Sequence, residues 1–110
     1  MMIGGLFVSH ITCSELLEWQ RHKDFTLLDV RLRDVKANHP LSIAGSIWQD
    51  PELIETWMTS VPSDRPVVVF CAHGRSVSHS VATQLNESGL AAHYLEGGLA
   101  AWIEKGQIID

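Results

Sequence analysis

A cysteine followed by a short polar loop is the feature of this chain best suited to chemistry. The loop CAHGRS, from Cys71 to Ser76, brings a thiol, an imidazole, a glycine, a guanidinium and a hydroxyl together. It follows the apolar run PVVVF (66–70), which is typical of a buried strand. A helical pattern begins directly after it, marked by Val77, Val81, Ala82 and Leu85. A thiol at such a strand-to-helix junction could act as a nucleophile.

The expected helix would help this thiol to lose its proton. At a helix N-terminus several backbone amides have no partner within the helix, and the macrodipole is positive. Gly74 allows a tight curl in which successive N–H groups face one anion. Arg75, and His73 when protonated, would add positive charge, and together these groups favour the nucleophilic thiolate. The alternative for Cys71 is an inert buried thiol, but the glycine, the basic residues and the helix start favour chemistry.

Composition limits the classes of protein to consider. The chain has 110 residues, 45% of them hydrophobic and 19% charged, with a net charge of −5. These values predict one globular domain spanning 1–110. The sequence has no basic stripe of the kind that nucleic-acid-binding proteins carry. No apolar run reaches the roughly 18 residues of a membrane span. The opening residues lack the basic region of a signal peptide, and two cysteines make no disulfide framework. We therefore expect a reduced, cytoplasmic protein.

The elements that position the cysteine are predicted as alternating strands and helices. We expect strands at 6–11, 26–30, 46–48, 66–70 and 91–95, each followed by a helical segment except 26–30. Because the main strands are apolar on both faces, they predict a parallel sheet covered by helices on two sides. The fold class is therefore α/β. The connection 31–45 is long for so compact a domain, and both a functional segment and a plain polar crossover stay open for it.

Local signals predict where these helices begin and end. Thr12 and Glu15 have the spacing of a capping box, opening a helix to about residue 21 that buries Leu16, Leu17 and Trp19. Asp50 is expected to cap a helix with Pro51 in its first position. Its predicted apolar stripe is Leu53, Ile54, Trp57 and Met58, and that of the last helix is Leu99, Trp102 and Ile103. Gly89 and Gly106 are placed to end the last two helices.

Four segments in order resemble the rhodanese domains, in particular the single-domain sulfurtransferases. LLDVR (27–31) is similar to the family's Asp-containing strand end, SIAGSI (42–47) to its GHIPGA segment, VVVFCAHGRS (67–76) to its cysteine loop, and YLEGGLAAWIEKG (94–106) to its C-terminal signature. The resemblance implies a three-layer rhodanese-like fold with a central parallel five-stranded sheet. It also implies that Cys71 is the catalytic residue and carries a persulfide. The implied substrate-binding residues are Ala72, His73, Gly74, Arg75 and Ser76.

The implied activity is transfer of sulfane sulfur from a thiosulfate-like donor to cyanide, a small thiol or a protein thiol. It requires neither a metal nor an organic cofactor, and no nucleic acid or membrane partner. Three positions depart from the family pattern. Ser42 stands where the family has the GHIPGA histidine, and the sequence leaves open whether Ser42 or the nearby His39 compensates. Ala72 and His73 stand where thiosulfate-specialised members carry more positive charge, so we expect slow turnover of thiosulfate.

Other functions could also use a cysteine in such a loop. A phosphatase or arsenate reductase needs an arginine six residues after the cysteine to hold its oxyanion, and that position is Val77. A non-enzymatic persulfide carrier or a regulatory, redox-sensing module stays open as the alternative. Asp29 and Arg31 are predicted to support the site, with Arg31 paired to Asp29 or Asp34 rather than binding a donor.

Some of the residues with possible chemistry also have a purely structural interpretation. Ser76 and Ser78 could simply cap the helix after Gly74. Cys13 lacks a glycine loop and is expected to be structural, and Trp102 to lie in the core. His73 and His79 do not have the usual spacing of metal ligands with the cysteine.

Overall fold

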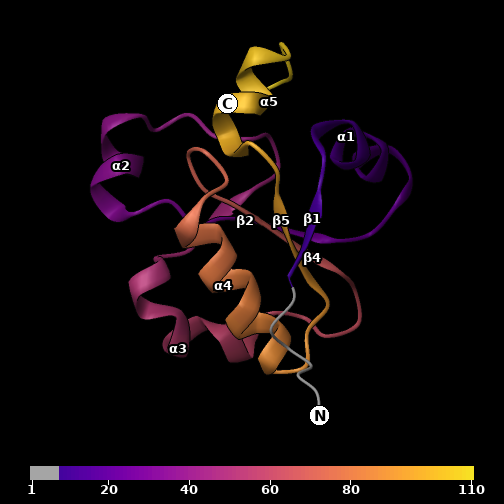
Figure 1. Ribbon diagram of the computed structural model, residues 1–110, viewed down its shortest axis with the longest axis vertical. Helices are drawn as coiled ribbons and strands as arrows, with labels where there is room; N and C mark the ends of the chain where they lie inside the picture. The colour runs from indigo at the N-terminus through magenta and orange to yellow at the C-terminus, as the bar shows by residue number, and fades with distance from the viewer. Residues whose placement is uncertain (1–7) are drawn as a thin grey trace.

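A five-stranded, wholly parallel sheet forms the centre of the computed structural model, which describes residues 8–110. The strands are β1 (Ser9–Ile11), β2 (Thr26–Asp29), β3 (Ile47–Trp48), β4 (Val67–Phe70) and β5 (Ala92–Leu95). They lie in the order β1-β5-β4-β2-β3, so β4 is central (Figure 1). The predicted parallel α/β sheet is therefore confirmed. Positions 6 and 7 of the first predicted strand lie outside the described residues.

The connections carry the helices α1 (Cys13–His22), α2 (Arg33–Asn38), α3 (Ile54–Trp57), α4 (Ser76–Glu87) and α5 (Gly98–Glu104). The 3-10 turns η1 (Pro51–Leu53) and η2 (Met58–Ser60) flank α3. None of the helices in residues 8–110 has the length and apolar character needed to cross a membrane.

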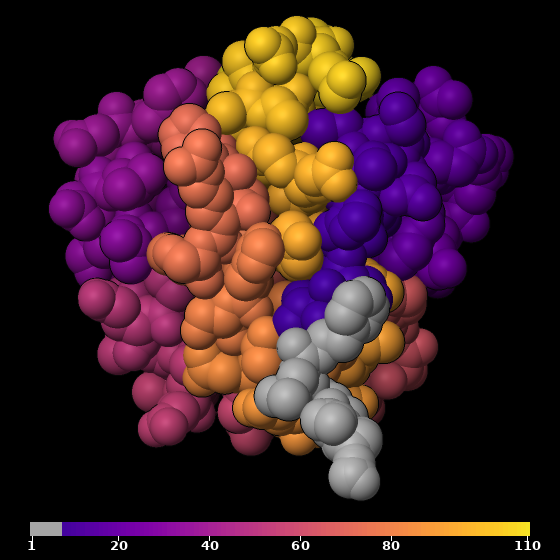
Figure 2. All heavy atoms as spheres, in the orientation of Figure 1, coloured from indigo at the N-terminus to yellow at the C-terminus, as the bar shows by residue number. Residues whose placement is uncertain are grey.

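The two faces of β4 lie in two different hydrophobic clusters. Val68 and Phe70 pack with residues of α1 and α5, whereas Val67 and Val69 pack with residues of α3 and α4. This alternation follows from the pleat of the strand, which points successive side chains to opposite faces. The space-filling view shows α4 along the middle of one face of the molecule, beside the segments of β5 and β1 (Figure 2). The three-layer arrangement is thus confirmed.

The helix signals were correct where they are local. Thr12 and Glu15 form the predicted capping box. Asp50 caps the next helical segment, as predicted: it directly precedes Pro51, and its side chain accepts a hydrogen bond from the Glu52 amide. The predicted burial of Leu53 is wrong because the first turn is a 3-10 helix, whose tighter winding changes which residues face inward. Ile103 was also expected in the core. Trp102 takes the inward position of α5 instead, and Ile103 is exposed.

The long connection 31–45 contains α2, which the sequence did not predict. This helix buries none of its own side chains, so it has no apolar stripe by which to recognise it. Beyond α2, the chain is fastened to the C-terminal residues. The amide of Ser42 donates to the carbonyl of Asp110 (3.0 Å), and the amide of Asp110 donates back to the carbonyl of Ser42 (2.9 Å). The crossover is therefore held at its far end by backbone pairing.

Candidate active site around Cys71

Cys71 lies directly after β4, at the carboxyl end of the central strand. Open parallel sheets bind ligands beyond this edge. The residue is 7% exposed and is one of the residues lining a cavity of about 140 Å³. The other lining residues are Arg31, Leu32, Val35, Ala72, His73, Arg75 and Val77. The structure thus brings the predicted nucleophile together with Ala72, His73, Arg75 and Arg31 around one opening.

The cysteine loop carries a run of backbone amides without protein partners. From Ala72 to Ser78, no N–H group donates a hydrogen bond to another group within residues 8–110. The helix α4 starts at Ser76 without a side-chain cap, and its first backbone hydrogen bond runs from His79 to Arg75 (3.2 Å). Gly74 has a φ of +70°, as expected for the curled loop. Unpartnered amides at a helix N-terminus form a ready site for an anion.

The turn between β5 and α5 packs against this loop and forms hydrogen bonds with it. The amide of Leu99 donates to the carbonyl of Cys71, and that of Ala100 to the carbonyl of Ala72, each at 2.9 Å. Gly98 has a φ of +61°, and a Cβ there would lie 2.5 Å from both the Cys71 carbonyl oxygen and the Gly74 nitrogen. Two backbones can approach this closely only because both positions are glycine. The sequence did not predict this contact with the loop.

Ser78 contacts the sulfur of Cys71 from the first turn of α4. The Cys71 Sγ–H donates to Ser78 Oγ (3.2 Å), and Ser78 Oγ–H donates to the carbonyl of Arg75 (3.3 Å). The expectation that Ser76 and Ser78 cap the helix is wrong, since α4 has no side-chain cap and Ser78 is fully buried. A signal was present in its spacing: Ser78 precedes Val81 by three residues and falls on the inward stripe of the helix.

Asp29 and Arg31 form a buried ion pair at the end of β2. Arg31 Nη2 lies 2.6 Å from Asp29 Oδ2, and Arg31 Nε also donates to this carboxylate. The remaining guanidinium hydrogen bonds go to the carbonyls of His39 (2.8 Å) and Leu41 (3.1 Å). Of the two predicted partners, Asp29 and Asp34, the structure pairs Arg31 with Asp29. Arg31 lines the cavity, yet nearly all of its guanidinium N–H groups already donate to Asp29 or to carbonyls of the connection 31–45.

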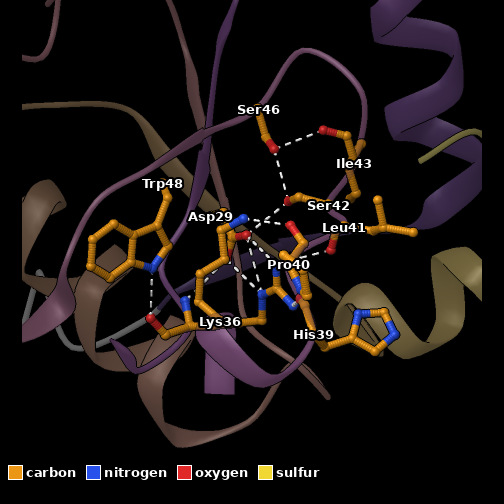
Figure 3. A network of polar contacts seen from close by, with 10 residues as sticks. Asp29, Lys36, His39, Pro40, Leu41, Ser42, Ile43, Ser46 and Trp48 are labelled. Atoms are coloured by element: carbon orange, nitrogen blue, oxygen red, sulfur yellow. Dashed lines mark hydrogen bonds and ion pairs between the residues drawn. The ribbon is translucent and has the colours of Figure 1, made fainter. Parts of the chain in front are cut away.

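Ser42 extends the same network, as Figure 3 shows for Asp29, Ser42 and Ser46. Its hydroxyl donates to Asp29 Oδ2 (2.7 Å) and lies 2.9 Å from Ser46 Oγ. His39 contributes its carbonyl to Arg31, while its side chain lines a second cavity. Of the two residues the sequence left open, it is therefore Ser42 that contacts the buried carboxylate.

The positive charge near Cys71 comes from few side chains. Arg75 is exposed, lines the cavity, and makes no ion pair within residues 8–110. His73 is also exposed at the opening. His79 makes its contacts elsewhere: its Nε2 lies 3.0 Å from the Gly74 carbonyl, and its ring centroid lies 3.8 Å from that of Tyr94, with the two rings tilted by 38°. In the described part of the chain, no three His, Cys, Asp or Glu side chains gather into a metal-binding cluster.

Comparison with known proteins agrees with the fold. The family model described as Rhodanese-like domain matches residues 12–105. The thiosulfate sulfurtransferase GlpE of Shewanella oneidensis is 31% identical over 96 residues, covering 86% of this chain and 92% of that protein. GlpE of Coxiella burnetii is 32% identical over 97 residues, covering 86% and 84%.

A solved structure gives the same result in three dimensions. The crystal structure of a rhodanese-related protein from Thermoplasma volcanium matches with a TM-score of 0.80 at 29% identity, covering 93% of this chain and 97% of that one. The family model spans most of the chain, including the cysteine loop and the turn that supports it. This chain belongs to the rhodanese-like domain family.

Proposed function

We propose that this protein is a sulfurtransferase that moves sulfane sulfur from an anionic donor to a thiophilic acceptor through a persulfide on Cys71. The observation that carries the proposal is the run of unpartnered amides from Ala72 to Ser78, which begins beside the thiol at a cavity. Such amides stabilise a negative charge on sulfur without having to reorganise during the reaction. The sulfurtransferase relatives support the same assignment.

In the first displacement, the Cys71 thiolate attacks the terminal sulfur of the donor. With thiosulfate, a new S–S bond forms to Cys71, the bond to the sulfonate sulfur breaks, and sulfite leaves with the electron pair. The thiol proton goes to solvent before the attack. The amides of Ala72, His73, Gly74, Arg75 and Ser76 would hold the persulfide anion and the oxyanion of the donor.

In the second displacement, the acceptor attacks the outer sulfur, and the Cys71 thiolate leaves. Cyanide would give thiocyanate, and a small thiol or a protein thiol would give a new persulfide. Neither step calls for a metal or an organic cofactor. Asp29 and Arg31 would act indirectly, since their buried ion pair holds the crossover that forms one wall of the cavity.

The alternative is a persulfide carrier or redox-sensing module that accumulates sulfur on Cys71 without turnover. It uses the same loop and differs only in the rate of the second displacement. A phosphatase is disfavoured because Val77 stands where its oxyanion would need an arginine. Both cysteines are free, which fits a reducing compartment, and we include a cytoplasmic location in the proposal.

Intact mass before and after incubation with thiosulfate tests the assignment. We expect one added sulfur atom, which cyanide removes as thiocyanate over repeated cycles. Cys71→Ser should add none. Cys13→Ala is the matched control and should behave as wild type, because this thiol is buried in the core. A single cycle without turnover would favour the carrier, and absence of a Cys71 adduct with any sulfane-sulfur donor would refute the proposal.

A further inference from the structure

The walls of the cavity beside Cys71 are largely apolar. Leu32, Val35, Ala72 and Val77 line it, and Val35 remains 38% exposed. A second cavity of about 210 Å³ adjoins the first, with which it shares Arg31, Val35, Ala72 and His73. Its own wall adds the apolar side chains of Leu99, Ala100 and Ile103. The cysteine thus opens onto a broad, solvent-open depression, called the chamber below, whose apolar walls could contact an organic group.

The chamber also offers little free positive charge. Arg31 lines both cavities, but its guanidinium is bonded to Asp29 and to two backbone carbonyls. Arg75 is the guanidinium there without an ion-pair partner in the described residues, and no lysine lines either cavity. Thiosulfate brings two negative charges and no apolar surface, so it complements this chamber poorly.

We infer, resting on the proposed function, that the preferred sulfur donor is a singly charged organic molecule in which an apolar group adjoins the anionic sulfane-sulfur head. An organic thiosulfonate has this chemistry. Its anionic head matches the amides of the loop and Arg75. Its apolar group matches the wall formed by Val35 and Ile103, two residues that are 38% and 39% exposed.

With this donor the reaction follows the same steps as the first displacement with thiosulfate. The Cys71 thiolate attacks the terminal sulfur of R–SO₂–S⁻, and an S–S bond forms. The bond between the terminal sulfur and the sulfonyl sulfur breaks, and the sulfinate R–SO₂⁻ leaves with the electron pair. No oxidant or reductant enters. The organic group R takes no part in bond making. Apart from its effect on how readily the sulfinate leaves, it contributes through binding and positioning.

Three donors separate the contributions of charge and apolar surface: benzenethiosulfonate, methanethiosulfonate and thiosulfate. With cyanide as acceptor, thiocyanate formation gives kcat/KM for each. Dividing each value by the rate at which the same donor reacts with free cysteine removes intrinsic reactivity. We expect benzenethiosulfonate to exceed methanethiosulfonate by about tenfold or more, as burial of several carbon atoms predicts. Thiosulfate should rank last.

The double variant Val35→Ser, Ile103→Ser tests the wall directly. Its ratio of benzenethiosulfonate to methanethiosulfonate should fall about tenfold relative to wild type, since both donors carry the same head. Ile47→Ser is the matched control: Ile47 is 60% exposed, lines neither cavity, and should leave the ratio unchanged. All three positions are exposed, so the variants should fold, which circular dichroism would verify.

The outcomes distinguish this inference from the function on which it rests. A Cys71 persulfide that forms with thiosulfate at least as readily as with the organic donors would overturn the inference and leave the sulfurtransferase assignment standing. An unchanged donor ratio in the double variant would overturn it in the same way. Failure of all three donors to label Cys71 would remove the proposed function, and this inference with it.

Discussion

The helix starts of α1 and α4 each have a buried cysteine beside them, yet only one is open to a ligand. At α1 the Thr12 amide donates to Glu15 Oε1 (2.9 Å), and the Glu15 amide donates to Thr12 Oγ1 (3.1 Å). At α4 no side chain caps the helix, and the loop before it keeps its amides unpartnered within residues 8–110. At α1, residues of the helix start itself bind the free amides, whereas at α4 the amides remain available to bind an anion.

The surroundings of the two thiols differ accordingly. Cys13 is 4% exposed and packs in the apolar cluster with Leu16 and Trp102. Burial raises the pKa of the Cys13 thiol, an effect only partly offset by Lys105. Cys71 is almost as buried but borders a cavity. Neither burial nor a nearby helix start is therefore enough to make a nucleophile; the open amides and the access to a cavity are what distinguish Cys71.

The largest expected difference is in the alkylation of the two thiols. At neutral pH, iodoacetamide should modify Cys71 about a hundredfold faster than Cys13, because burial keeps Cys13 protonated and enclosed. Peptide mass analysis of samples quenched at intervals would give both rates. In denaturant the two rates should converge. Equal rates in the folded protein would show that the open helix start has no chemical effect.

A side chain at Gly98 should disturb the cysteine loop more than one at Gly106. Both residues have positive φ, but a Cβ at Gly98 meets backbone atoms at 2.5 Å, whereas one at Gly106 meets nothing within 4 Å. Gly106→Ala should cost about 1–2 kcal/mol of unfolding free energy from its conformation alone. Gly98→Ala should cost about 3 kcal/mol or more and should also slow Cys71 alkylation. Urea unfolding with parallel labelling checks both, and similar effects at the two positions would contradict the proposed support of the loop.

Removing the Ser78 hydroxyl should have a moderate effect on sulfur transfer. Ser78→Ala takes away the hydrogen-bond partner of Cys71 Sγ (3.2 Å) and should lower kcat about tenfold while leaving KM near its wild-type value. Ser80→Ala, on the exposed side of the same helix, is the control and should change neither constant. A Ser78→Ala enzyme with wild-type kcat would limit the role of Ser78 to packing.

The smallest effect is expected at the capped helix. Hydrogen bonds from Thr12, first that of its backbone amide, lower the pKa of Glu15 below the usual glutamate value. A lowered pKa in the folded state means that the charge stabilises the fold above the unfolded-state pKa and that this contribution is lost as the pH falls through the folded-state pKa. Glu15→Gln should therefore lower the urea midpoint slightly at neutral pH and not in acid. A difference from wild type that persists in acid would contradict this, and sulfur transfer should be unchanged throughout.

Sequence reasoning succeeded where the signal is local. The capping box, the strand Val67–Phe70 and the loop after it are encoded by neighbouring residues, and each lies where it was expected. The pairing of Arg31 with a nearby acidic residue could also be predicted, but the choice of Asp29 over Asp34 comes from the structure. The sequence predicted five strands in one parallel sheet, but their order in that sheet comes from the structure alone.

The features that were missed depend on contacts between distant segments. Nothing within α2 indicates a helix, because none of its side chains is buried. The contact between Gly98 and the cysteine loop joins positions on opposite sides of α4 and β5, and neither glycine alone reveals it. Ser78 was interpreted as a cap because serine commonly fills that role, although its position relative to Val81 and Leu85 indicates the inward face.

The close backbone contact of Gly74 with Gly98 has a consequence for protein engineering. The cysteine loop cannot be treated as a portable segment, because its shape is set in part by a turn that lies after the next strand. Grafting Cys71–Ser76 alone onto another parallel sheet would transfer the thiol and the glycine but not the surface against which the loop is pressed. A functional transplant would have to carry the Gly97–Gly98 turn and the start of α5 as well, in the same register relative to the central strand.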